Sequence, residues 1–330
     1  MIKDGILIVD KPQNWTSHDC VAVARKALGA DKLGHGGTLD PMAEGLLPLF
    51  VGRATRIMEY LDMDDKTYIC GIRLGITTDT QDIWGQVTAS APADHVDRET
   101  FRDTLMSFLG EQKQIPPMYS AVRINGRRLY EYARDGEDVN AAARDINVKK
   151  IRFIDFDEKA MEGRFEITVS KGTYIRTICN DIGDRLGCGA AMCYLKRTAV
   201  GIFNLDNATG PDRLKELMNL RKEMKEDYQV PRDIAEAIIP VDRPMVNLGK
   251  VSLSRDRAWY FAAGNSIRWR QVKVLEAPRG TADVKNKRGR GYDVLYRVYM
   301  DDGRFIGTGY YDAKTNELKA DKIFVKRQEL

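Results

Sequence analysis

The residues best placed to do chemistry lie in a glycine-rich segment, residues 34–47. It contains four glycines, one of the three histidines of the chain (His35), and Asp40 directly before Pro41. Glycine lets a ligand approach the main chain closely, and proline stiffens the chain and favours an extended conformation at the preceding residue. The segment therefore predicts a stiff loop that presents a carboxylate, although a glycine-rich surface turn has the same pattern.

Two further segments supply side chains that suit a carboxylate in a base-binding site. Tyr68 lies in an expected strand, residues 67–74, and Tyr174-Ile175-Arg176 lies at an expected strand-to-helix junction. A neighbouring arginine favours the ionised form of a carboxylate, which can then act as a nucleophile or a base, and tyrosine rings can stack on a nucleobase. Taken singly, each residue also has a structural explanation: a turn, the core, or a surface ion pair.

Other chemistries find little support in the chain. It has no glycine-rich nucleotide-binding signature, which argues against a nucleotide cofactor. The five cysteines are scattered, and neither they nor His18, His35 and His95 have metal-ligand spacing. We therefore expect reduced thiols, no metal and no cofactor. A glycosidase-like pair formed by Asp40 and Glu44 is disfavoured, because the glycines and Pro41 oppose the helix that would align them.

Composition indicates a soluble protein of two domains. The chain has 330 residues, of which 43% are hydrophobic and 30% charged. It shows neither a signal peptide nor a membrane-spanning run, so we expect a cytoplasmic protein. Residues 241–330 carry 19 Lys and Arg against 11 Asp and Glu, whereas the rest of the chain is slightly acidic. This basic end predicts a polyanionic partner, with a solvated basic face as the alternative.

The local patterns predict a mixture of strands and helices without regular alternation. Residues 5–9 read as a buried strand, residues 17–28 as a helix capped by Thr16 or Ser17, and residues 46–51 as a strand in which Pro48 indicates an edge or a bulge. Asn125-Gly126 predicts a hairpin.

The segment after this hairpin, residues 127–134, is both basic and aromatic. This composition suits contact with the phosphates and bases of a nucleic acid, but an ordinary amphipathic helix has the same pattern. Several short strands and one helix after a linker at residues 240–244 predict a small β-barrel-like module. It contains a basic loop, Lys285–Arg290.

Several motifs, in one order, resemble those of the TruB family of tRNA pseudouridine synthases. The motifs are Lys11-Pro12 with Thr16-Ser17, the aspartate motif at residues 34–41, Leu74-Gly75 with Thr78-Asp79-Thr80, Asp82 and Gly85, the segments 117–121 and 129–134, and the arginine motif at residues 170–177. They run from about Gly5 to Arg197. Beyond them, the C-terminal module resembles a PUA-like RNA-binding domain only loosely.

The resemblance implies an α+β fold, the pseudouridine-synthase fold with a mixed, mostly antiparallel sheet. It implies a catalytic domain at residues 1–240 with an RNA-gripping insertion at about residues 115–147, and a PUA-like domain at residues 245–330. The implied reaction is isomerisation of the uridine at position 55 in the T loop of tRNA. The implied partner is tRNA, and we expect a monomer without an obligate protein partner.

The resemblance also implies a role for individual residues. Asp40 would be the nucleophile, Arg176 would keep it charged, and Tyr68 would stack on the uracil and assist proton removal. The other implied contacts are Tyr174 and Leu195 in the base pocket, His35 in the space left by the extruded nucleotide, and Lys11, Arg127 and Arg128 on backbone phosphates.

Two rival interpretations share this fold. One is a subunit of a guide-RNA particle, against which the long insertion argues. The other is a non-catalytic RNA-binding or tRNA-folding protein, against which the presence of Asp40, Tyr68 and Arg176 argues.

Overall fold

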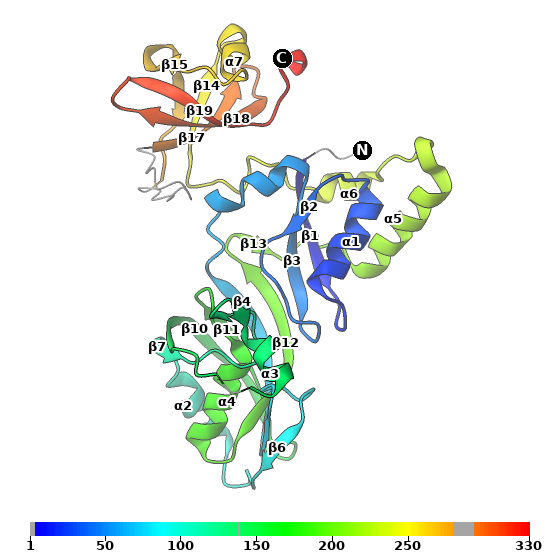
Figure 1. Cartoon of the computed structure of the whole chain (residues 1–330), viewed down its shortest axis with the longest axis vertical. Coiled ribbons are helices and arrows are strands. Elements are labelled where there is room, and N and C mark those ends of the chain that lie inside the picture. The colour runs from blue at the N-terminus through cyan, green and yellow to red at the C-terminus, as the bar shows by residue number, and fades with distance from the viewer. Residues whose placement is uncertain (1–3, 138, 280–293) are drawn as a thin grey trace.

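A long, mixed β-sheet forms the centre of the molecule, and a second sheet follows at the C-terminal end (Figure 1). The computed structural model describes residues 4–137, 139–279 and 294–330. The predicted basic loop Lys285–Arg290 lies outside these residues. None of the helices in the described part of the chain is long and apolar enough to cross a membrane.

The central sheet confirms the predicted mixed, mostly antiparallel α+β class. Its strands in the described residues are β1 Gly5–Lys11, β2 Leu33–His35, β3 Glu44–Val51, β4 Lys66–Leu74, β7 Gly110–Gln114, β10 Arg144–Asp157, β11 Glu162–Val169, β12 Ala190–Val200 and β13 Phe203–Asn204. The order is β1-β3-β12-β4-β11-β10-β7, with β2 paired to β3 and β13 to β12. Only the β3–β12 pairing in this described sheet is parallel.

Helices cover this sheet at both ends. They are α1 Ser17–Leu28, α2 Arg98–Met106, α4 Ile175–Leu186, α5 Pro211–Met224 and α6 Arg232–Ala237, whereas α3 Leu129–Asp135 lies away from the sheet. The predicted cap of α1 is confirmed, because Thr16 accepts a hydrogen bond from the Asp19 amide and Gly29 ends the helix with a positive φ. Gly187 ends α4 in the same way.

The two helix layers bury separate cores. Helices α1 and α5 pack on the face of β1 and β3 that carries Leu7, Leu47 and Leu49. Helices α2 and α4 pack against β4, β10, β11 and β12 around Phe101 and Phe165. The site described below lies between these two packed regions.

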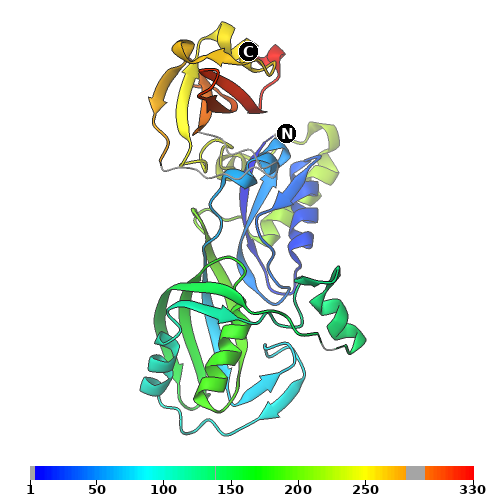
Figure 2. The same ribbon diagram turned by 60° about the vertical axis from the view of Figure 1, so that its left-hand side comes forward.

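Two small hairpins project from the body. One pairs β5 Ile76–Thr78 with β6 Val87–Ser90, and the other pairs β8 Arg123–Ile124 with β9 Arg127–Arg128. The second is the hairpin predicted at Asn125-Gly126, both of which have positive φ. Together with α3 it projects to one side of the sheet (Figure 2).

The C-terminal module is an all-β unit with one helix, as predicted. Its described elements are β14 Gly249–Leu253, α7 Arg255–Phe261, β15 Ile267–Arg268, β16 Lys273–Glu276, β17 Val294–Met300, β18 Phe305–Asp312 and β19 Glu317–Ile323. The strand order is β15-β19-β18-β17-β14-β16.

The connection between the two sheets is packed, although a linker was predicted there. Met245 and Leu248 are buried in one cluster with Leu295 and Phe324 of the module and Phe50 of the body. In addition, Lys322 donates a hydrogen bond of 2.7 Å to the Arg56 carbonyl. Apolar burial therefore fixes the module on the body.

Pro48 does not mark a bulge, and the predicted edge is only local: β3 lies inside the sheet, but neither β2 nor β12 pairs with it at Pro48. Pro48 lies opposite Ile8 in an unbroken register with β1, and β3 has partners on both sides. Its carbonyl accepts a hydrogen bond from Gly36, just beyond the end of β2. The backbone nitrogen of Pro48, which carries no hydrogen, therefore lies between the part of β3 that pairs with β2 and the part that pairs with β12. No hydrogen bond between strands is lost there.

Gly45 allows β3 and β12 to meet at this junction, and its replacement tests the fold. Its φ is +101°, and a Cβ there would lie 2.2 Å from the carbonyl oxygen of Arg197. We expect Gly45→Ala to lower the free energy of unfolding by at least about 2 kcal/mol. Gly210→Ala is the control, because φ is −76° and no atom lies within 4 Å. Equal urea midpoints for the two variants would contradict this account.

Candidate active site

A cleft of about 440 Å³ lies where the Asp40 loop (residues 36–43, between β2 and β3) meets the middle of the central sheet. Its lining includes residues 37–40 of the loop, residues 172–176, and residues 119–121 of the predicted insertion. Five of the nine predicted site residues line this cleft: Asp40, Tyr68, Tyr174, Arg176 and Leu195. The fold thus brings together segments that are far apart in the chain.

Asp40 and Arg176 form the charged pair of the cleft. Their closest side-chain atoms, Asp40 Oδ2 and Arg176 Nη2, are 3.6 Å apart. The Asp40 side chain is 45% exposed, whereas that of Arg176 is 8% exposed. Arg176 Nη2 also donates a hydrogen bond of 2.6 Å to the Tyr119 carbonyl. A buried, fixed cation beside an accessible carboxylate suits a nucleophile that a substrate must reach.

Asp82 is a second carboxylate on Arg176 to which sequence reasoning assigned no role. Its Oδ2 lies 3.8 Å from Arg176 Nη1, and its Oδ1 accepts hydrogen bonds from the Thr80 hydroxyl and the Trp84 amide. Burial raises the pKa of Asp82, while the charge of Arg176 acts in the opposite direction. The available signal was its position in the Thr-Asp-Thr-x-Asp segment.

Arg197 of β12 holds the Asp40 loop from beneath, and no sequence signal pointed to it. Its side chain is fully buried. Nη2 donates to the Gly37 carbonyl at 3.0 Å, Nη1 to the Thr38 carbonyl at 3.3 Å, and Nε to the Leu46 carbonyl at 2.9 Å. One guanidinium therefore ties the first part of the loop to β12 and to β3, the strand that follows the loop.

Lys11 performs a similar task from β1, which replaces the predicted phosphate contact. It is fully buried, and Nζ donates to the carbonyls of Pro12, Trp15 and Pro41 at 2.9, 2.6 and 3.2 Å. An ammonium has three donors, so none is left for RNA in this structure. Burial lowers the pKa of Lys11.

Ser17 fixes the residue that precedes Asp40. Its hydroxyl donates to the Leu39 carbonyl at 3.1 Å and accepts from the Leu39 amide at 2.9 Å. The bonded atoms are buried, so water cannot easily replace these bonds. Ser17 belongs to the first family motif, but the resemblance did not predict that it braces the loop.

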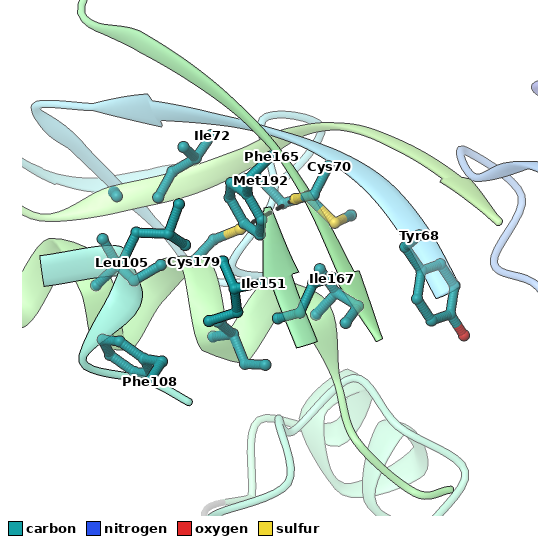
Figure 3. Packing of buried hydrophobic residues seen from close by; sticks show 14 of the residues in the cluster. Tyr68, Cys70, Ile72, Leu105, Phe108, Ile151, Phe165, Ile167, Cys179 and Met192 are labelled. Atoms are coloured by element: carbon teal, nitrogen blue, oxygen red, sulfur yellow. Dashed lines mark hydrogen bonds between the residues drawn. The ribbon is translucent and has the colours of Figure 1, made fainter. Parts of the chain in front are cut away.

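Tyr68 lines the cleft and belongs to a buried cluster of hydrophobic residues. Figure 3 shows its hydroxyl pointing away from the other labelled side chains. Burial raises the pKa of Tyr68, although the positive charge of Arg197 acts in the opposite direction. The phenol therefore stays protonated at neutral pH. Together with Tyr174 and Leu195, its ring gives the cleft aromatic and apolar walls.

His35 lies outside the cleft, on β2 next to the Asp40 loop. Its ring meets that of His18 edge to face, with centroids 5.9 Å apart, and its Nδ1 is buried without a hydrogen-bond partner in the described residues. Burial, with the charge of His18 second, lowers the pKa of His35. The imidazole is therefore neutral near pH 7.

Arg127 and Arg128 also lie outside the cleft, on β9 of the insertion. Arg127 forms ion pairs with Asp135 and Glu137 and stacks on the Tyr132 ring at 4.2 Å. Arg128 donates to the Tyr130 hydroxyl at 2.8 Å. The amphipathic-helix interpretation of the following residues is confirmed, and the phosphate contacts stay a prediction.

The site is therefore a carboxylate held against a buried arginine beside aromatic and apolar walls. Within the described ranges, no three or more His, Cys, Asp or Glu side chains are grouped so as to hold a metal ion. Such a cleft can bind a planar, uncharged ring and bring a nucleophilic oxygen to it.

The family models that match this chain divide it within the site. Residues 25–175 match the model of the TruB family pseudouridylate synthase N-terminal domain, and residues 176–246 match that of the tRNA pseudouridylate synthase B C-terminal domain. The boundary falls between Ile175 and Arg176, so Asp40 and Arg176 come from different models.

Relatives and solved structures agree with these matches. The tRNA pseudouridine synthase B of Bacillus subtilis is 42% identical over 99% of both chains, and that of Clostridium kluyveri is 37% identical over 98% of this chain and 100% of its own. A chain in the crystal structure of a Cbf5-Nop10-Gar1 complex is 25% identical, with a TM-score of 0.66 over 98% of this chain and 86% of that one. The predicted pseudouridine-synthase fold is thereby confirmed. The chain is an isomerase and belongs to the TruB family of pseudouridylate synthases.

Proposed function

We propose that this enzyme converts the uridine at position 55 in the T loop of tRNA to pseudouridine, with Asp40 as the nucleophile. The observation that carries the proposal is the Asp40–Arg176 pair in a cleft with Tyr68, Tyr174 and Leu195 on its walls. The relatives named tRNA pseudouridine synthase B support tRNA as the substrate. Identity to them is higher than to the Cbf5 chain, which favours tRNA over a guide-RNA particle.

The chemistry follows from the difference between substrate and product. Uridine must lose its bond from ribose to nitrogen and regain one to carbon, with one proton leaving that carbon and one proton joining the freed nitrogen. The atoms of the base and sugar are otherwise unchanged, so the step needs no oxidant or added group. Asp40 would attack the ribose C1′ or the uracil ring and hold the intermediate while the base turns.

Extrusion of the target nucleotide is required, because a stacked base cannot reach Asp40. Tyr68 and Tyr174 would then receive the uracil by stacking, Leu195 would pack against it, and Arg176 would stabilise the Asp40 carboxylate. His35 would occupy the space that the nucleotide leaves. The neutral imidazole inferred from its lowered pKa suits this packing role.

The remaining parts of the chain would hold the RNA. We propose residues 1–240 as the catalytic domain and residues 245–330 as a PUA-like RNA-binding domain. Its excess of basic residues supports this assignment. Arg127 and Arg128 would contact phosphates from the insertion once RNA competes with the ion pairs and hydrogen bond described above.

Incubation with an unmodified tRNA transcript tests the proposal. We expect pseudouridine at position 55 when the product is mapped by chemical modification and mass spectrometry. A transcript with cytidine at that position is the control and should yield none. Pseudouridine at other positions only, or at no position, would contradict the proposed target.

Asp40→Asn tests the nucleophile. The amide keeps the shape of the side chain but is a poor nucleophile, so we expect single-turnover rates to fall by at least about a thousandfold. Binding of a T stem–loop RNA, measured by fluorescence anisotropy, should be retained. Turnover close to the wild-type rate would remove Asp40 from its role.

Ser17→Ala tests the bracing of the Asp40 loop. The variant loses both bonds to Leu39, and a small displacement of a reacting group is costly, so we expect the single-turnover rate to fall by about ten- to a hundredfold. The affinity for RNA should stay the same. Ser107→Ala also removes two hydroxyl bonds, one donated to the Thr104 carbonyl and one accepted from Arg185 Nη1, but at the end of α2 and away from the cleft, and it should leave the rate unchanged. Equal rates for both variants would show that the brace is not needed.

A further inference from the structure

Lys66 is a cleft residue to which the proposed mechanism assigns no task. It is the first residue of β4, two positions before Tyr68, and its half-buried side chain lines the cleft. Its Cε lies 3.7 Å from the position that a Cβ on Gly37 would take. Gly37 itself is exposed and carries no side chain. The ammonium of Lys66 therefore stands beside an open stretch of the Asp40 loop.

The Lys66 ammonium differs from the neighbouring cations because it has no hydrogen bond or ion pair with any residue in the described part of the chain. Lys11 and Arg197 donate to carbonyls, and Arg176 lies beside Asp40. The two acidic residues just before Lys66 are engaged elsewhere: Asp64 pairs with Lys171 and Asp65 with Lys149, each at 2.7 Å.

An unpaired cation at a half-buried position is costly to keep. Burial, followed by the positive charge of Arg197, lowers the pKa of Lys66. An anion in the cleft would reverse this effect, because an opposite charge nearby favours the charged amine. The side chain is thus placed for an anionic ligand that enters the cleft.

We propose that Lys66 binds the phosphodiester group next to the extruded uridine. The inference rests on the proposed function, since an RNA substrate carries its anionic charge on phosphates. Uracil is uncharged, and the aromatic and apolar walls of the cleft contact its ring. The base therefore does not need the charge of Lys66. A lysine ammonium binds phosphate as a point charge. Gly37 leaves the room that a sugar–phosphate backbone needs to pass Lys66 and reach Asp40.

The test compares the binding of T stem–loop RNAs by full-length proteins that carry Asp40→Asn, so that no turnover occurs. Adding Lys66→Met keeps the apolar stem and removes the charge. We expect the affinity to fall about tenfold, and the slope of log affinity against log salt to decrease by about 0.7–0.9, the value for one phosphate contact. Lys66→Arg should restore the slope. Lys159→Met is the control, because Lys159 is an exposed lysine in the turn between β10 and β11 and does not line the cleft, and it should keep the slope of the parent.

A second RNA locates the contact. It carries one uncharged methylphosphonate at a phosphate that flanks the target uridine. At one of the two flanking positions, the methylphosphonate should weaken RNA binding by the parent Asp40→Asn protein about tenfold. The same methylphosphonate should not weaken RNA binding by the protein that also carries Lys66→Met. Full sensitivity of Lys66→Met at both positions, or an unchanged salt slope, would overturn the assignment. If wild-type enzyme still forms pseudouridine in the unsubstituted RNA, the proposed function stands despite that failure, whereas no product at all would overturn both.

Discussion

The active cleft depends on two fully buried cations that hydrogen-bond the main chain of the Asp40 loop. Removing an ammonium or guanidinium group from water costs several kcal/mol unless polar partners replace the water. Here the partners are carbonyl groups: those of Gly37, Thr38 and Leu46 for Arg197, and those of Pro12, Trp15 and Pro41 for Lys11. If the loop moved, the two buried cations would lose hydrogen-bond partners, and if a cation moved, the loop would lose the bonds that hold it. The loop and the cations therefore stabilise each other. This mutual requirement holds Asp40 in place.

The central strands connect this brace to the rest of the site. β12 contributes Arg197 to the loop and Leu195 to the wall, and its neighbour β4 contributes Tyr68 and Lys66. The parallel contact of β12 with β3 lies at Gly45, where the loop rejoins the sheet. Arg176 comes from the first turn of α4, and its bond to the Tyr119 carbonyl links the cleft to the insertion. One short region of sheet therefore sets the positions of the carboxylate, its arginine and the base-binding walls.

The sequence predicted the parts of the site that depend on local pattern or on family motifs, namely the stiff loop, the caps of α1, and the convergence of Asp40, Tyr68 and Arg176. It did not predict what depends on packing. Arg197 lies in an ordinary strand pattern, and only the tertiary fold shows that its charge is buried beneath the loop. The resemblance assigned Lys11 to a phosphate, and the residues around Lys11 give no sign that its side chain is fully buried. Strand β7, Gly-Glu-Gln-Lys-Gln, has no apolar alternation, and only its pairing with β10 makes it a strand.

The central claim is that the target uridine leaves its loop and enters the cleft beside Asp40. A crystal structure of the Asp40→Asn variant bound to a T stem–loop RNA tests this claim most directly. The account predicts electron density for the uracil between Tyr68 and Tyr174, with the ribose next to residue 40. A uridine that stays stacked in the RNA loop, or a base bound elsewhere while this cleft stays empty, would contradict it.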